Sequence, residues 1–146
     1  MENRFETFTW QITKINRSIR RIKNDVMSEY DLKVPHANCI YYLHKYGQLT
    51  AKELCEFCDE DKSGISRSVE ILEKEGYLTC ADGQKKRYKS PLKLTEKGEN
   101  VAQVINERIE QVLDISSKGL TEKEREKFYQ ALSLISENLQ NVSDGK

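Results

Sequence analysis

The first thirty residues carry a regular stripe of large apolar side chains. Its members recur at alternating intervals of three and four residues: Phe5, Phe8, Ile12, Ile15, Ile19, Ile22 and Val26. This spacing keeps one face of an α-helix apolar over several turns, and its mean period of about 3.5 residues keeps two packed helices in register. We therefore expect a long helix within residues 1–30 whose apolar seam packs on another helix, part of it in a dimer interface.

Three shorter helices are predicted between residues 35 and 75. Pro35 suits the first turn of a helix that ends at Gly47. The pair Thr50 and Glu53 has the spacing of a capping box, in which each side chain satisfies a backbone donor at a helix start. A third helix over about 62–75 buries an apolar face and exposes a polar one. The acidic residues before it are expected to act as helix caps: Asp59, Glu60 and Asp61.

A β-hairpin is predicted after this helix. Residues 77–80 and 92–94 alternate in polarity, and Asp82-Gly83 between them is a turn signal. Several cations lie in the loop, so the hairpin has a charged tip. Pro91 cannot donate a ladder hydrogen bond, and the returning strand is therefore expected to be an edge strand or irregular at that point.

Two more helices complete the predicted fold. One starts at Thr95 and ends near Gly119, and the last starts at Thr121 with a second capping box. The last helix repeats its own apolar stripe: Phe128, Leu132, Ile135, Leu139 and Val142. We expect a mostly α protein with a small β-hairpin wing, in one domain over residues 1–146. Residues 1–30 and 99–142 are predicted to be dimerisation helices, and residues 35–98 a winged helix-turn-helix lobe.

Composition and charge narrow the function. The 146 residues contain no apolar run of the roughly 18 residues that a membrane helix needs, and the acidic, aromatic start does not resemble a signal peptide. We therefore expect a cytoplasmic protein with no membrane partner. The net charge is zero, yet residues 62–97 carry nine basic and five acidic side chains. A helix fits the DNA major groove and a basic hairpin beside it reaches the backbone, so double-stranded DNA is the expected partner.

Four motifs resemble the MarR family of transcriptional regulators. They are LTAKELC at 49–55, DKSGISR at 61–67, LEKEGYL at 72–78 and LTEKG at 94–98. The resemblance implies a homodimer that binds a pseudo-palindromic operator and responds to a small aromatic or anionic effector, and we expect such a ligand-responsive repressor here. It places Ser63, Ser66 and Arg67 toward DNA, and Arg87 nearest to the wing-tip arginine of the family. With the neighbouring cations, the candidate DNA-binding residues are Lys62, Ser63, Ser66, Arg67, Lys85, Lys86 and Arg87.

The remaining chemistry has several interpretations. The four cysteines, Cys39, Cys55, Cys58 and Cys80, include one Cys-x-x-Cys pair, which fits a zinc or redox site or small apolar residues of the core. We expect the core role, no metal and no cofactor, with Cys80 as the thiol most open to oxidation. An effector pocket is expected in a cleft beside Trp10, His36, Tyr41 and Tyr46.

Two other function classes compete with gene regulation. The chain has no phosphate-binding loop, dinucleotide motif or nucleophile elbow, so we do not expect an enzyme. The second class is a winged-helix protein-interaction module without specific DNA binding, because Glu60 and Glu70 place negative charge near the predicted DNA-facing helix. Salt-dependent binding to duplex DNA distinguishes this module from a regulator.

Overall fold

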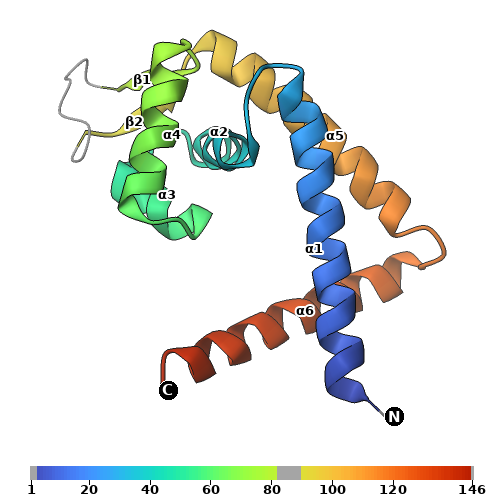
Figure 1. The fold of residues 1–146 in the computed structure, drawn as a ribbon. Helices are drawn as coiled ribbons and strands as arrows, with labels where there is room; N and C mark the ends of the chain where they lie inside the picture. The colour runs from blue at the N-terminus through green and yellow to red at the C-terminus, as the bar shows by residue number, and fades with distance from the viewer. Residues whose placement is uncertain (1–2, 82–89, 146) are drawn as a thin grey trace. The chain divides into compact units, whose positions relative to one another are not determined.

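The computed structural model of the chain describes residues 3–81 and 90–145. The chain divides into two compact units, Met1–Arg108 and Ile109–Lys146. The described elements are, in chain order, α1 (Arg4–Ser28), α2 (Val34–Tyr46), α3 (Ala51–Cys58), α4 (Lys62–Lys74), β1 (Leu78–Cys80), β2 (Leu92–Leu94), α5 (Glu96–Ser116) and α6 (Glu122–Ser143) (Figure 1). None of these helices has the length and apolar content that crossing a membrane would require. The predicted mostly α fold with one β-hairpin is confirmed.

Helix α2 is the centre of the first unit. It packs against α1, α3, α4 and β2, and Figure 1 looks almost along its axis. The largest fully buried side chains come from these elements and from β1: Met27, Ile40, Leu43, Leu54, Ile65, Leu72, Leu78 and Leu92. Burying each such side chain contributes about 1.5–3 kcal/mol relative to leaving it exposed. The core therefore fixes α3 and α4 on α2 as a helix-turn-helix.

The helix ends follow the local sequence signals. Pro35 lies in the first turn of α2, and Gly47 ends that helix with a φ of 83°. The Thr50 hydroxyl accepts the Glu53 N–H, and the Glu53 carboxylate accepts the Thr50 N–H. The same reciprocal pair, Thr121 and Glu124, starts α6. Both predicted capping boxes are confirmed.

The hairpin is antiparallel and has a third pairing partner. Leu78 lies opposite Leu94 and Cys80 opposite Leu92, as the alternation of the sequence predicts. Leu92 also exchanges two backbone hydrogen bonds with Leu49, at 2.7 and 3.1 Å. The returning strand is therefore an interior strand at Leu92, with Leu49 on its other side. Pro91 immediately precedes the strand, where its missing N–H disrupts no strand pairing.

The first turn of α5 is joined to the end of α4. The Thr95 hydroxyl donates to the Gly76 carbonyl at 2.6 Å, and the Lys97 ammonium donates to the Glu75 carbonyl at 2.7 Å. The Lys97 Nζ also lies 4.3 Å from the centre of the Tyr77 ring. These contacts link the helix-turn-helix to the helix that follows the hairpin.

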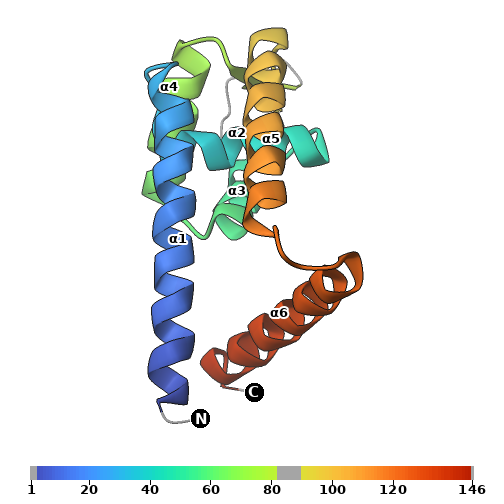
Figure 2. The same ribbon diagram turned by 90° about the vertical axis from the view of Figure 1, so that its right-hand side faces the viewer.

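Two apolar helix faces remain exposed within the single chain. On α1, Phe5 is 80% exposed and Ile15 is 54% exposed, whereas Val26 is buried against the first unit. The N-terminal half of α1 extends beyond α2 and α3 in both ribbon views (Figure 2). Along α6, which belongs to the second unit, no described residue is buried, and Leu139 is 54% exposed.

Candidate nucleic-acid interface

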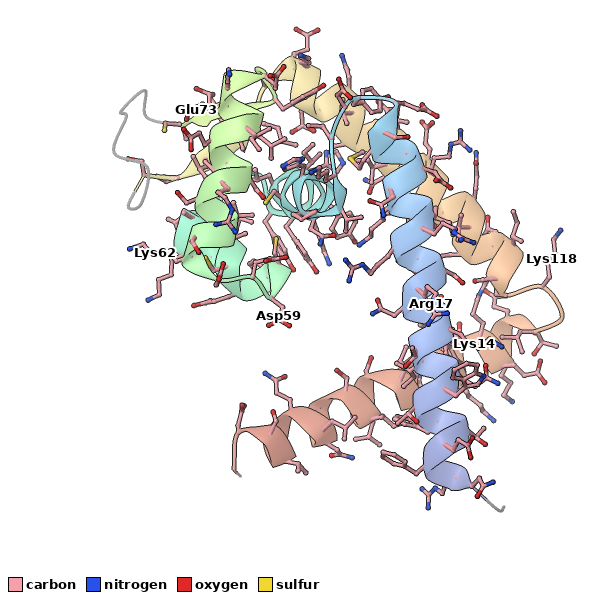
Figure 3. All side chains as sticks on the ribbon, in the orientation of Figure 1. Lys14, Arg17, Asp59, Lys62, Glu73 and Lys118 are labelled. Atoms are coloured by element: carbon pink, nitrogen blue, oxygen red, sulfur yellow. The ribbon has the colours of Figure 1, made fainter. Side chains whose placement is uncertain are left out.

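Helix α4 presents a polar face to solvent. Its opposite face, formed by Ile65, Val69 and Leu72, is buried on the core. The predicted DNA-facing residues of α4 are all exposed: Lys62, Ser63, Ser66 and Arg67. Lys62 projects outward from the first turn of α4 in Figure 3. The structure thus gathers these four predicted residues on the surface of one helix that the core holds in place.

The start of α4 is fixed by Asp61. Its Oδ1 accepts the Gly64 N–H at 2.7 Å, which makes Asp61 the N-cap, and the Ser63 hydroxyl lies 3.4 Å from the same oxygen. A Cβ on Gly64 would lie 2.8 Å from Asp61 Oδ1, so the glycine leaves room for the capping carboxylate. Asp59 ends α3 in the left-handed conformation, with a φ of 50°. The predicted capping role is confirmed for Asp61.

The end of α4 is also defined by specific contacts. Gly76 has a φ of 80°, and the Tyr77 N–H donates to the Leu72 carbonyl at 2.8 Å. This six-residue return is the Schellman arrangement that the glycine favours. Lys97, which donates to the Glu75 carbonyl, places a cation at the negative end of the helix dipole. Both ends of α4 are therefore held by residues outside the helix.

The predicted tip of the wing lies outside the described residues. This concerns Lys85, Lys86 and Arg87, which fall within residues 82–89. The described base of the wing carries Thr79 and Lys93 at opposite positions, and both are exposed on the sheet face away from the core. Lys93 is a cation of the wing that the sequence analysis did not select.

The exposed face of α4 is mixed in charge. Glu70 lies on it, and Asp59, Glu60 and Asp61 are exposed at its N-terminal turn. These carboxylates repel phosphate, so the positive potential of the face comes from a small number of cations. The contribution of Arg67 to any DNA contact is correspondingly large.

The four residues predicted to line an effector pocket come from two helices, Trp10 from α1 and His36, Tyr41 and Tyr46 from α2. Trp10 is exposed on α1, and the 17 residues from Trp10 to the buried Met27 place it about 25 Å along the helix from the core. His36 is buried at the start of α2, where its Nδ1 accepts the Lys33 N–H at 3.0 Å. Burial and the nearby Lys33 lower the pKa of His36. Tyr46 lies at the far end of α2.

Tyr46 belongs instead to an aromatic cluster between α2 and α3. Its ring stacks on Phe57 with centroids 4.6 Å apart, and Tyr42 stacks on Phe57 at 5.3 Å. Tyr41 meets Tyr42 edge-to-face at 5.1 Å. The sequence analysis missed Phe57, although its spacing from the α3 core residue Leu54 was visible.

A cleft lies where α5 leaves the hairpin. It has a volume of about 520 Å³ and is lined by two tyrosines, three polar residues and two valines. These residues are Tyr30, Tyr77, Glu96, Lys97, Asn100, Val101 and Val104. The lining thus combines two aromatic rings with the ammonium group of Lys97 and the carboxylate of Glu96.

The cysteines occupy less uniform environments than the sequence suggested. Cys80, expected to be the thiol most open to oxidation, is buried on β1. The interaction with Cys58 and burial raise the pKa of Cys39 well above its usual value, whereas the interaction with Cys39 and the charge of Lys23 lower the pKa of Cys58 against the effect of burial. The sequence analysis found no positive charge beside these thiols, because Lys23 lies on α1, far from them in the chain. Among residues 3–81 and 90–145, no group of three metal-binding side chains is positioned to hold an ion.

Comparison with known proteins agrees with this architecture. A model described as MarR family matches residues 30–87, which include α2 to α4. An HTH-type transcriptional regulator of Bacillus cereus is 24% identical over 136 residues, covering 92% of this chain and 90% of that protein. The HTH-type transcriptional regulator YfiV of Bacillus subtilis is 23% identical, covering 77% of this chain and 70% of its own length.

Solved structures reproduce the fold over most of the chain. A MarR-family regulator from Listeria monocytogenes, complexed with 26mer DNA, is 25% identical with a TM-score of 0.80, covering 94% of this chain and 95% of that one. A MarR from Staphylococcus aureus in complex with salicylate and kanamycin is 13% identical with a TM-score of 0.84, covering 96% and 95%. The chain therefore matches the MarR family over residues 30–87 and shares the fold of solved MarR-family regulators over most of its length.

Proposed function

We propose that the protein is a homodimeric repressor that binds a pseudo-palindromic operator and is released by a small aromatic or anionic effector. The observation that carries this proposal is the exposed polar face of α4, whose apolar face and both ends are fixed by the rest of the lobe. A rigid helix of this kind can enter the major groove with its N-terminal residues toward the bases. The Listeria relative was solved with 26mer DNA, which supports the same use here.

The roles of the α4 side chains follow from their chemistry. Arg67 has a planar guanidinium that can make a bidentate contact with guanine, and we assign it base recognition. Lys62, Ser63 and Ser66 lie nearer the helix start and suit phosphate or base contacts. Lys85, Lys86 and Arg87 of the wing remain our candidates for the flanking backbone, joined by Lys93.

Dimerisation is supported by the exposed apolar stripes of α1 and α6. Large side chains such as Phe5, Ile15 and Leu139 are more than half exposed in the single chain. Contiguous apolar surface of this extent marks an interaction site. A second copy of the chain carries the same stripes and can cover them. A symmetric dimer presents two α4 helices, which matches an operator with two related half-sites.

We assign the effector to the cleft beside Tyr77 and Lys97. Lys97 contacts the last turn of α4, so a ligand that withdraws its ammonium from the Glu75 carbonyl would loosen that end of the recognition helix. Such a ligand changes DNA affinity only by binding the two conformations of the protein with different affinity. The salicylate bound to the Staphylococcus relative has the size and charge that this cleft suits.

The proposal is tested by selecting bound duplexes from a random library and measuring affinity against salt. We expect a pseudo-palindromic site and a steep decrease of affinity with salt, since each phosphate contact contributes about 0.9 to the logarithmic slope. Arg67→Ala should weaken binding to the selected site by about 1–3 kcal/mol and relax the sequence preference of the protein. Lys123→Ala, which removes one exposed cation from α6, is the matched control and should bind as the wild type does.

Two outcomes would contradict the assignment. Selection that enriches no sequence, with affinity unchanged in Arg67→Ala, would favour a protein-interaction module whose acidic residues around α4 repel DNA. For the repressor role, transcription from a promoter that contains the selected site should decrease when the protein is added, and salicylate should restore it. An increase in transcription would identify an activator.

A further inference from the structure

The middle of α1 carries an open surface cleft that the proposed function does not use. Its volume is about 550 Å³, and all of its lining residues are exposed polar residues of α1. Besides one threonine, the lining consists of Arg17, Arg20, Arg21, Asn16, Asn24 and Asp25. At a rise of about 1.5 Å per residue, it extends roughly 18 Å along the helix axis. We call Arg17, Arg20 and Arg21 the arginine cluster.

The arginine cluster has an excess of positive charge. None of its three guanidinium groups forms an ion pair or a hydrogen bond with another described residue, and Asp25, one turn after Arg21, does not pair with it. The whole of α1 carries six basic and two acidic side chains. Like charges three and four residues apart destabilise a helix, as Arg17 does with Arg20 and Arg21. An anion that bridges the three groups would offset this repulsion.

The arginine cluster and the apolar seam of α1 lie on opposite faces of the helix. The seam runs from Phe5 to Val26, and at about 100° per residue its mean direction lies roughly 160° from that of the cluster. Figure 3 shows Arg17 near the middle of α1, beyond the part of this helix that packs on α2. A dimer that buries the seam would therefore leave the cluster open to solvent.

The side chains of the cleft are suited to phosphate groups. A guanidinium group is a planar fork of N–H donors that matches two oxygens of one phosphate, and it keeps its charge at any physiological pH. The amides of Asn16 and Asn24 add neutral donors. The lining has no aromatic or aliphatic residue, unlike the cleft beside Tyr77 and Lys97. The site can therefore bind phosphate oxygens but offers no surface to an aromatic ring.

The number of charges indicates more than one phosphate. A single phosphate ester carries at most about two negative charges at pH 7, fewer than the three guanidinium groups. Several linked phosphates along the helix can engage all three arginines at once. We propose that the arginine cluster of α1 binds a linear polyphosphate chain, either as an inorganic anion or as the phosphate chain of a nucleotide.

Duplex DNA bound at α4 would not reach this face. Helix α2 lies between α1 and α4 and packs on both of them (Figure 1). Packed helices have axes about 8–10 Å apart, and α4 turns its exposed face away from the core. The arginine cluster is therefore separated from the proposed DNA contact by the thickness of the lobe. The choice of polyphosphate over DNA rests on the proposed function, whereas the anion chemistry does not.

The first test titrates the full chain with inorganic anions of increasing length by calorimetry at low ionic strength. Affinity should increase from orthophosphate through pyrophosphate to tripolyphosphate, by at least about tenfold over the series, and decrease with added salt. ATP and GTP should bind within about threefold of tripolyphosphate, because the lining does not contact a base. Equal affinities for the three inorganic anions, or a strong preference for one nucleotide, would overturn the proposal.

The two sources of the chain are distinguished by length. Affinity that continues to increase for chains longer than tripolyphosphate supports an inorganic polymer that lies along the cleft. Affinity that reaches its maximum at three phosphates supports a nucleotide triphosphate. Both results keep the arginine cluster as the site.

Two triple variants separate the site from the net charge of the protein. The arginine variant replaces the whole cluster: Arg17→Gln, Arg20→Gln and Arg21→Gln. The control variant removes three exposed cations outside α1: Lys118→Gln, Lys123→Gln and Lys127→Gln. Glutamine is a good helix former, and each exposed contact contributes about two- to fivefold, so the arginine variant should bind tripolyphosphate at least about tenfold more weakly. The control should bind as the wild type does, and an equal loss in both would overturn the site.

Trp10 reports where the anion binds. It is the only tryptophan of the chain, and it is exposed on α1 about 10 Å before Arg17 along the axis, on roughly the same face. At low ionic strength the cluster should concentrate iodide around this ring. Saturating tripolyphosphate should therefore reduce quenching of Trp10 fluorescence by iodide but not by neutral acrylamide. Unchanged iodide quenching would place the anion elsewhere.

Sedimentation and DNA binding test the other uses of this face. The arginine variant should assemble as the wild type does, and it should bind the selected operator with the same salt slope. Weaker self-association would assign the cluster to an interface between copies, and a smaller slope would assign it to the DNA backbone; either result overturns the proposal. If the wild type binds no DNA at all, the proposed function fails, while the tripolyphosphate titrations still decide the anion site.

Discussion

Asp61 offers a sharp test of how the recognition helix is held in place. Its carboxylate accepts the Gly64 N–H at 2.7 Å and lies at the N-terminus of α4, so it contributes both a hydrogen bond and a favourable charge–dipole interaction. Asp61→Ala removes both interactions, whereas Asp61→Asn keeps an oxygen that can accept the same hydrogen bond. The two substitutions therefore separate the cap from the charge.

The expected magnitudes follow from this geometry. Loss of the cap costs about 1 kcal/mol, and loss of the exposed charge costs roughly 0.3–1 kcal/mol more. Asp61→Ala should therefore lower the free energy of unfolding by about 1–2 kcal/mol, and Asp61→Asn by less than about 1 kcal/mol. At a urea m-value of about 2 kcal/mol per molar, the midpoint for Asp61→Ala falls by roughly 0.5–1 M.

DNA affinity should change in the opposite sense for the asparagine variant. A carboxylate about 10 Å from a phosphate repels it by roughly 0.4 kcal/mol in water, so Asp61→Asn should bind an operator about twofold more tightly at low salt. Urea unfolding at fixed protein concentration and titration of labelled DNA measure the two effects. Equal loss of stability in both variants would refute the assignment of the hydrogen bond as the main contribution.

Three further predictions address other parts of the fold. Because the pKa of His36 is lowered in the folded protein, the unfolded chain binds a proton at this imidazole more readily than the folded chain does. The free energy of unfolding should therefore decrease as the pH falls below about 6.5, and level off below the pKa of the folded state. Urea midpoints of the wild type and of His36→Asn, measured against pH, check this dependence. Gly98→Ala should lower stability by about 1–3 kcal/mol in thermal unfolding, because a Cβ there overlaps the Tyr77 carbonyl oxygen, whereas Asn100→Ala on the same helix should not. Leu139→Glu on the exposed stripe of α6 should weaken dimerisation by roughly 100-fold or more in sedimentation, whereas Gln130→Glu on the opposite face should leave it unchanged, and equal effects would refute the proposed interface.

Much of the fold was predictable because its signals are local. The capping box of Thr50 and Glu53 lies within one helical turn, and Gly47 and Gly76 stop helices through their own backbone conformations. The helical spacing of the apolar residues that include Ile65 also predicted which face of α4 would be exposed. These features depend on residues close in the sequence, so they need no knowledge of the tertiary structure.

The features that were not predicted are those that join distant segments. Leu49 pairs with Leu92 across the hairpin base, and Lys23 meets Cys58 through the packing of α1 on α2. The pocket expected beside Trp10 and His36 stays a prediction, because its residues come from different helices. Contacts between side chains on different helices require the crossing geometry, which periodicity does not provide.

Residues outside the recognition helix hold both of its ends. Asp61, three residues after Cys58, fixes the start of α4, and Lys97, in the first turn of α5, fixes its end. The buried face of α4 resists lateral displacement, because interiors are packed too closely to deform continuously. A small displacement of either end of α4 can therefore change the direction in which the Arg67 side chain points. An effector beside Lys97 would accordingly alter the DNA contact of Arg67 through the C-terminal end of α4, and only by binding the two conformations with different affinity.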